Sequence, residues 1–171
     1  MNAQTYLKAL TASLALAGAA HLTTAELSAA TATASMPVSA TVSNNCTITT
    51  NPIAFGSYNP VATHASANLD AAGAVIIACT KGAVTTLGLD TGANAAGGTR
   101  QLASSGNLLS YELYQDSSRS TVWGDSGAAL YNSGTAPSKN ARTFPVYGRV
   151  SAGQDVPAGS YTDSVVATVN F

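Results

Sequence analysis

Residues 31–43 read TATASMPVSATVS, and their side chains alternate between apolar and polar along the whole stretch. A period of two places alternate side chains on opposite sides of a β-strand. One face carries the apolar set, which comprises Ala32, Ala34, Met36, Val38, Ala40 and Val42. The stretch therefore predicts a long amphipathic strand whose apolar face needs a groove to enter. Folding back onto its own domain is the alternative for this strand.

The same period of two continues along the rest of the chain, and no convincing long helix interrupts it. Clusters of Gly, Asn, Asp, Ser and Pro separate the apolar stretches at short spacing, as turn residues do. Further strands are expected at residues 46–49, 53–55, 74–80, 84–90, 100–103, 108–115, 121–123, 128–131, 142–150 and 162–171. Many short strands predict a single all-β sandwich domain.

The composition narrows the function classes. Of 171 residues, 9% are charged and 46% are hydrophobic, whereas about 25% charged residues is typical of globular domains. The net charge is -1, and there is no basic cluster for a phosphate backbone or an anionic membrane. These values favour an extracellular structural protein over a cytoplasmic enzyme and disfavour nucleic acid as a partner.

The beginning of the chain has the layout of a secretory signal peptide. Residues 9–20, ALTASLALAGAA, carry no charge and follow Lys8, and small residues follow them. This apolar run is well short of the roughly 20 residues that span a bilayer. We expect a signal peptide over residues 1–30, with cleavage near Ala30 and a boundary between 25 and 34. A buried amphipathic helix of the domain is the alternative.

The two cysteines, Cys46 and Cys79, lie in the part expected to be exported. In an oxidising compartment, an isolated pair without CxxC spacing predicts one disulfide, worth roughly 3 to 4 kcal/mol. A zinc site is disfavoured because only His21 and His64 accompany the two thiols. We expect His64 to be a solvated loop residue, and we expect no metal and no cofactor.

An enzyme is considered because residues 124–127, Gly-Asp-Ser-Gly, resemble the nucleophile motif of chymotrypsin-like serine proteases. That chemistry needs a histidine base beside the serine and a buried aspartate to orient it. His64, flanked by Thr63 and Ala65, lacks the sequence context of such a base. We therefore interpret residues 124–127 as a turn and expect no enzymatic activity.

Aromatic residues raise the possibility of a sugar-binding surface. The set consists of Trp123, Tyr111, Tyr114, Tyr131 and Tyr147. Aromatic side chains at strand positions more often belong to the core or to cross-strand pairs. We expect the core role for this set.

The order of several short motifs resembles the spore coat protein U family, which includes the pilin subunits of archaic (Csu-type) chaperone-usher pili. The most specific parts are the cysteine spacing, the Tyr-x-Leu-Tyr-x-Asp strand at residues 111–116, and the ending at residues 161–171. The other matching segments are 45–48, 55–58, 75–79, 109–110, 145–150 and 159–160. The resemblance covers essentially the whole chain after the signal peptide.

This resemblance implies an incomplete immunoglobulin-like β-sandwich, over residues 44–171, that is completed by donor-strand exchange. A periplasmic chaperone would fill the hydrophobic groove first, and the N-terminal extension of a neighbouring subunit, residues 31–43, would replace it in the fibre. The donor face would be the apolar set of residues 31–43. The groove edge, also held by the chaperone, would be formed by Val165, Ala167, Val169 and Phe171.

The function implied is that of a structural pilin that polymerises into surface fibres for adhesion and biofilm formation. Its partners would be identical or related pilin subunits, the periplasmic chaperone and an outer-membrane usher, and it would reach the cell surface through the periplasm. A secreted spore-coat-type structural protein and a sugar-binding adhesin module are the alternatives.

Two residue types depart from a uniform donor strand. Pro37 lacks a backbone N–H, so it interrupts pairing near the centre of the strand. Ala32, Ala34 and Ala40 make the apolar face thin, so shallow pockets are expected opposite them.

Overall fold

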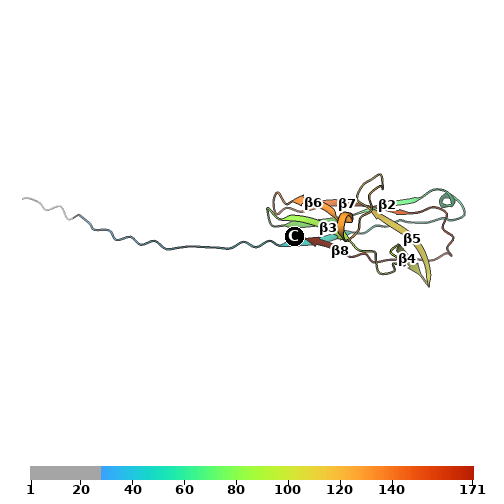
Figure 1. Ribbon diagram of the computed structural model, residues 1–171, viewed down its shortest axis with the longest axis horizontal. Helices are drawn as coiled ribbons and strands as arrows, with labels where there is room; N and C mark the ends of the chain where they lie inside the picture. Colours follow the sequence, from blue (N-terminus) through green and yellow to red (C-terminus); the bar gives the residue numbers. More distant parts are fainter. Residues whose placement is uncertain (1–27) are drawn as a thin grey trace, which may run out of the picture. The chain divides into compact units, whose positions relative to one another are not determined.

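The computed structural model describes residues 28–171, and Figure 1 shows their course. These residues form eight strands and two short 3-10 turns, η1 (Thr63–Ala65) and η2 (Gly127–Ala129), with no α-helix among them. In this part of the chain, no helix has the length and apolar character to cross a membrane. The expected signal peptide lies almost entirely outside the described residues.

The larger sheet, as described, contains five antiparallel strands in the order β1-β2-β7-β5-β4. They are β1 (Cys46–Asn51), β2 (Leu69–Cys79), β7 (Arg142–Val150), β5 (Asn107–Tyr114) and β4 (Arg100–Ser104). β2 lies between β1 and β7 because its length allows it to pair with both, opposite Cys46 to Asn51 on one side and opposite Arg142 to Val150 on the other.

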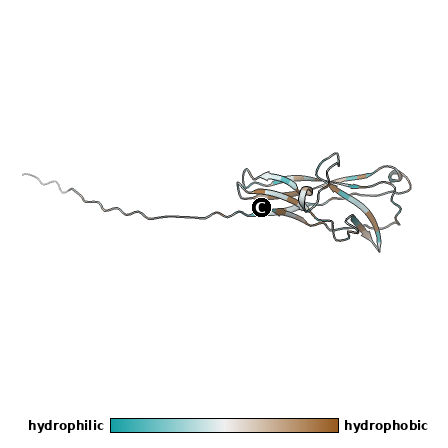
Figure 2. Cartoon of the chain, in the orientation of Figure 1, coloured by the Kyte–Doolittle hydropathy of each residue, from teal (hydrophilic) through white to brown (hydrophobic). Residues whose placement is uncertain are grey.

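The smaller sheet, among the same residues, has the order β6-β3-β8. Its strands are β6 (Tyr131–Thr135), β3 (Val84–Leu89) and β8 (Ala167–Asn170). β3 is central and antiparallel to both neighbours, and its pairing with β6 shifts register between Thr85 and Thr86. Hydrophobic positions alternate with hydrophilic ones along the strands (Figure 2), as expected when one face of each sheet is buried.

The core draws its side chains from both sheets. It includes Val75, Ile77, Leu87, Leu89, Leu109, Leu113, Trp123, Val146 and Val150. Trp123 is 0% exposed, and its indole N–H donates to the carbonyl of Leu87 at 3.0 Å. Tyr131 stacks on Trp123 with ring centroids 4.8 Å apart. The expected core role is confirmed for Trp123 and for the buried Tyr111.

A buried arginine ties the two sheets together. The guanidinium of Arg100 donates to the carbonyls of Leu89 at 2.8 Å, Asp90 at 2.7 Å and Trp123 at 2.7 Å, and it forms an ion pair with Glu112. Charged groups are buried at acceptable cost only when they are paired and hydrogen-bonded in this way. Arg100 thus fixes the end of β3 against β4 and β5.

Most of the expected strands are confirmed, and the all-β, two-sheet fold is confirmed with them. The predicted strands at 46–49, 84–90, 100–103, 108–115 and 142–150 match β1, β3, β4, β5 and β7 closely. β2 begins earlier than expected, at Leu69. Its first half, LDAAGA, is rich in small residues and has a weak apolar signal.

Several other expectations are wrong in their bounds or type. Residues 53–55 and 121–123 form no strand, apart from one isolated bridge between Tyr114 and Val122. Residues 127–129 form η2, and β6 begins only at Tyr131. The expected strand at 162–171 is reduced to Ala167–Asn170, because only this part pairs continuously with β3. Residues 124–127, expected to form a turn, form an irregular connection in which the Gly124 N–H donates to the Ala129 carbonyl at 2.9 Å.

His64 is buried, so the expectation of a solvated loop residue is wrong. Its Nδ1 accepts a hydrogen bond from the Asn59 N–H at 2.8 Å, and its ring stacks on Tyr58 with centroids 5.0 Å apart. The η1 turn folds the imidazole inward, where these contacts satisfy it. Its role is structural.

Residues 31–43 form no strand within this chain, so they are not paired inside its own sandwich. All of them are exposed, including the largest apolar side chains, with Met36 at 85%, Val38 at 89% and Val42 at 82%. The physical reason is that an amphipathic strand needs a hydrogen-bonding partner for its backbone. No strand among residues 28–171 pairs with them.

Candidate functional site

β1 and β8 are edge strands of different sheets, and they lie close together. Within the described residues, β1 pairs only with β2, and β8 pairs only with β3. An unpaired strand edge presents backbone N–H and C=O groups that can bind another strand. The candidate site is the opening between these two edges.

In the segment that contains β8, every second residue directs its backbone N–H and C=O groups toward this opening. The carbonyls of Ser164 and Val166 accept hydrogen bonds from Ala93 and Asp90, at 3.0 and 3.1 Å, so they face β3 and its extension. Because backbone groups alternate in direction along a strand, Val165, Ala167 and Val169 direct their N–H and C=O groups to the open side. These three side chains are half-buried, whereas Val166, Thr168 and Asn170 are exposed.

β1 repeats this arrangement on the other side of the opening. The Thr80 N–H donates to the carbonyl of Asn45 at 2.9 Å, which orients residues 45, 47 and 49 toward β2. By the same alternation, Cys46, Ile48 and Thr50 turn their backbone groups to the opening. Cys46 and Ile48 are half-buried and pack against the core.

A hydrophobic cavity of about 280 Å³ lies between the two edges. Its apolar walls come from both sheets and from the segment after β1, and they include Ile53, Phe55, Val75, Leu89, Leu102, Leu113, Val146, Val165 and Ala167. A second cavity of about 750 Å³ is lined by residues 53–58 and 156–163 together with Pro60, Leu69, Leu102, Leu109 and Val150. The two cavities share Ile53, Phe55, Leu102 and Asp163, so they adjoin each other, and the two together are called the groove below.

Two glycines of the large sheet leave the space in which one wall of this groove lies. A Cβ atom on Gly73 would lie 2.6 Å from both the Asn51 carbonyl oxygen and Cγ1 of Ile53. A Cβ atom on Gly148 would lie 2.7 Å from Cζ of Phe55. Residues 51–55 can therefore lie directly on the sheet only because both positions lack a side chain.

The groove is also lined by a carboxylate, that of Asp163. Its Oδ1 accepts from the backbone N–H and the side-chain amide of Asn94, at 3.1 and 3.0 Å. Its Oδ2 accepts from the Tyr111 hydroxyl at 2.7 Å. Burial, together with this hydrogen bond to the carboxylate, raises the pKa of Tyr111 well above its usual value.

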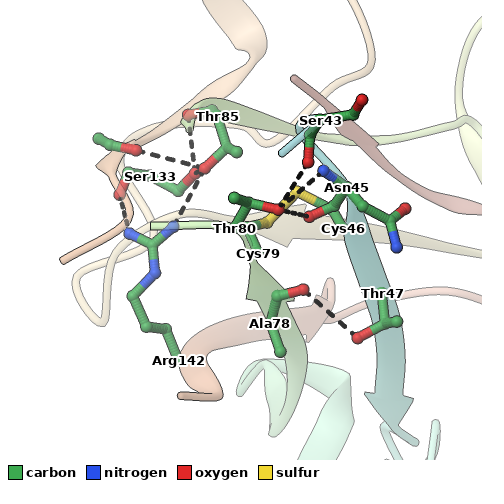
Figure 3. The surroundings of a disulfide bond; sticks show 11 residues. Ser43, Asn45, Cys46, Thr47, Ala78, Cys79, Thr80, Thr85, Ser133 and Arg142 are labelled. Atoms are coloured by element: carbon green, nitrogen blue, oxygen red, sulfur yellow. Dashed lines mark hydrogen bonds between the residues drawn. A yellow bond between two sulfur atoms is a disulfide. The ribbon is translucent and has the colours of Figure 1, made fainter. Parts of the chain in front are cut away.

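The Cys46–Cys79 disulfide joins the first residue of β1 to the last residue of β2. Figure 3 shows Thr80 next to this bond. The Thr80 hydroxyl accepts from the Asn45 N–H at 3.0 Å, and it lies 3.3 Å from the carbonyl oxygens of both Ser43 and Asn45. The predicted disulfide is confirmed, and it lies where the N-terminal segment meets the β-sandwich.

The residues singled out from the sequence lie in the C-terminal segment and in residues 31–43. Val165, Ala167 and Val169 line the opening, and Phe171, 56% exposed, ends the same segment. The apolar face of residues 31–43 is exposed.

Sequence reasoning missed the opposite wall, formed by Ile53, Phe55 and Leu102, and the glycines beneath it. An indirect signal was present in Gly73, an isolated glycine in a strand pattern that marks a close approach of backbone.

Residues 28–171 contain no cluster of three or more His, Cys, Asp or Glu side chains that could hold a metal ion. The described groove offers backbone pairing and apolar contacts, together with the hydrogen-bonded carboxylate of Asp163. This chemistry suits an extended peptide.

Most of this chain matches sequences that are already known. Residues 32–168 match the family model of the Spore Coat Protein U domain. Protein U of Myxococcus xanthus is 37% identical over 158 residues, a match that covers 84% of this chain and 87% of Protein U.

A solved structure with a similar fold is a pre-assembly complex of chaperone CsuC and tip adhesion subunit CsuE, from the archaic chaperone-usher Csu pili of Acinetobacter baumannii. The TM-score is 0.52 at 20% identity, and the match covers 77% of this chain and 40% of the matched chain. At this identity, the likeness concerns the fold.

Proposed function

Because the chain belongs to the Spore Coat Protein U family, we propose that it is a pilin of an archaic chaperone-usher pilus that polymerises by donor-strand exchange. Residues 31–43 of one copy enter the groove between β1 and β8 of a second copy. Residues 1–30 act as the signal peptide and residues 44–171 as the pilin domain.

The observation that carries this proposal is the match between an exposed apolar strand pattern and an open groove. Residues 32–42 and 161–171 have the same length, and in each stretch every second residue belongs to one face. The groove presents unpaired backbone on two sides and apolar walls between them. An inserted strand would pair by backbone hydrogen bonds and place alternate side chains into the groove, as in β-augmentation.

The free energy of insertion comes mainly from the larger donor side chains. Met36, Val38 and Val42 are almost fully exposed in this chain, and burying such a side chain contributes about 1.5 to 3 kcal/mol. Pro37 has no backbone N–H, so one hydrogen bond is missing at the centre of the strand. The bonds formed on either side of Pro37 and these three side chains supply the affinity.

The same groove suits a periplasmic chaperone before assembly. The open edge of β8, with Val165, Ala167, Val169 and Phe171, is the surface that the chaperone would hold, and an outer-membrane usher would receive the complex. The fold of this chain resembles one found in a chaperone complex with a pilus subunit. The product is a fibre at the cell surface that serves adhesion and biofilm formation.

A secreted spore-coat structural protein is the second candidate. The family description and the relatedness to Protein U favour it, and strand exchange would serve a coat as well as a pilus. Genes for a chaperone and an usher beside the gene for this chain would favour the pilus. A sugar-binding module is disfavoured, because Trp123 is fully buried and Tyr131 is stacked on it.

The test is a pair of adjacent substitutions with the same charge. Val38→Asp places a carboxylate on the donor face, and an unpaired charge in the groove costs several kcal/mol. Ser39→Asp places the same charge on the opposite face and is the control. We expect Val38→Asp to abolish fibres and heat- and detergent-resistant ladders, whereas Ser39→Asp assembles like the wild type. Electron microscopy and gel electrophoresis provide the measurement.

Equal assembly of the two variants would contradict the proposal. The proposal would also be contradicted if the isolated wild-type chain were a stable monomer. In that monomer, residues 31–43 would be paired inside their own sandwich and would show no tendency to exchange. A self-contained coat or binding protein would then be the better interpretation.

A further inference from the structure

If residues 31–43 are a donor strand, as proposed above, they have an alternative target in their own chain. Val42 is separated from Cys46 only by Ser43, Asn44 and Asn45. Three-residue loops join antiparallel strands in hairpins, and Ser and Asn are frequent turn residues. A hairpin at this point would lay residues 37–42 along the open edge of β1 and carry residues 32–36 past its end. The subunit would then close its own groove and have no donor left for a second copy.

The contacts of Thr80 oppose this hairpin. Its backbone N–H donates to the carbonyl of Asn45 at 2.9 Å, and its hydroxyl accepts from the Asn45 N–H at 3.0 Å. The same hydroxyl lies 3.3 Å from the carbonyl oxygen of Ser43, within reach of a further hydrogen bond. Figure 3 shows Thr80 directed at Ser43 and Asn45 from the end of β2.

These bonds continue the pairing of β1 with β2 past the disulfide. They hold residues 43–45 in line with β1, which begins at Cys46. A hairpin needs the chain to reverse direction within residues 43–45, so it must give up the bonds to Ser43 and Asn45. The neighbouring Cys46–Cys79 bond keeps Thr80 opposite Asn45 and makes the arrangement persistent.

We propose that Thr80 is a positioning residue that keeps the N-terminal segment out of its own groove and thereby directs it to a second copy of the chain. The contacts of the Thr80 hydroxyl can be removed by substituting the side chain, whereas the hydrogen bond of its backbone N–H cannot. Because one typical hydrogen bond changes an equilibrium by about three- to tenfold, its loss should raise the ratio of self-closed to open monomer by that factor.

The experiment compares three full-length variants with the wild type. Thr80→Val removes the hydroxyl while keeping the shape, and Thr80→Ser restores a hydroxyl. Thr47→Val is the matched control, because the Thr47 hydroxyl contacts only Ala78 in the same strand pair, at 3.4 Å, and does not reach residues 43–45. Hydrogen exchange with mass spectrometry reports the protection of residues 32–42 in monomers isolated by size exclusion. The yield of multimers is measured in parallel.

We expect Thr80→Val to raise the ratio of self-closed to open monomer, measured as protection of residues 32–42, by about three- to tenfold, and to lower the multimer yield. Thr80→Ser and Thr47→Val should behave like the wild type. A change of stability alone would not move protection specifically in residues 32–42. Thr80→Val monomers with an unprotected segment and wild-type multimer yield would overturn the inference.

A separate arm distinguishes failure of this inference from failure of the proposed function. A labelled synthetic peptide of residues 31–43 is added to the full-length Val38→Asp chain, whose own segment cannot enter the groove. Binding of the peptide supports donor-strand exchange, whether or not Thr80 directs it. If the peptide does not bind and the wild type forms no multimers, the proposed function and the inference are both overturned.

Discussion

At the residue scale, the polar cluster inside the groove has a measurable dependence on pH. Tyr111 is buried, and its hydroxyl donates to Asp163. Burial and this carboxylate raise the pKa of Tyr111, with a smaller contribution from Asp90 in the same direction and an opposing one from Arg100. A neutral Tyr111 is therefore part of the folded state over the whole physiological range.

The sign of the effect follows from linkage. The folded-state pKa of Tyr111 exceeds the unfolded value of about 10, so its contribution is fully present below pH 10 and is lost as pH rises above it. We expect the free energy of unfolding in urea to fall steeply above pH 10 in the wild type. Tyr111→Phe should lower stability by about 1 kcal/mol at pH 7 and should show a shallower alkaline fall. An unchanged alkaline slope in Tyr111→Phe would contradict this assignment.

At the element scale, the wall formed by residues 51–55 depends on Gly73 of β2 and Gly148 of β7. In an unobstructed strand, replacing glycine by alanine would stabilise the fold by about 0.5 to 1 kcal/mol. At Gly73 the new Cβ would lie 2.6 Å from the backbone oxygen of Asn51, so the wall must move. Replacing Gly73 by alanine should therefore destabilise the fold instead of stabilising it.

We expect Gly73→Ala to destabilise the domain by about 1 to 3 kcal/mol, as overpacking does, and to weaken binding of the 31–43 peptide. Urea unfolding and a peptide titration are the measurements. The matched control is Ala72→Ser, a small addition at the preceding, exposed position of the same strand. A stabilised Gly73→Ala chain would show that residues 51–55 do not rest on the sheet.

The elements also show what the sequence could predict. Strands with clear alternation, such as β5 and β7, were predicted well because their pattern reflects burial of one face. Residues 53–55 carry the same pattern in Ile53 and Phe55, yet they pack on top of a sheet through their side chains and pair with no strand. Periodicity reports burial of side chains and does not report backbone pairing.

For the same reason, only part of the candidate site could be predicted from the sequence. The apolar faces of residues 31–43 and 165–171 are visible as alternation, and the family resemblance implied their roles in the proposed exchange. The cavity wall at Leu102 and the contacts of Thr80 depend on tertiary neighbours far along the chain. No local pattern encodes them.

At the scale of the whole molecule, the proposed assembly transmits tension from copy to copy through residues 43–46. The disulfide between Cys46 and Cys79 lies where that tension enters the β-sandwich. Force that arrives at Cys46 passes covalently to the end of β2, a strand held on both sides by β1 and β7. The segment between the two cysteines is thereby shielded from stretching.

The disulfide is thus a mechanical anchor, and its value lies in strength under load as well as in equilibrium stability. In single-molecule pulling of an assembled fibre, we expect a Cys46→Ser/Cys79→Ser chain to yield at lower force. It should also show an extension step, from residues 46–79, that the oxidised wild type lacks. Identical force curves for the two chains would mean that the backbone bonds between β1 and β2 already withstand the tension. A fibre built in this way would hold against flow because each subunit receives the load at its one covalent cross-link.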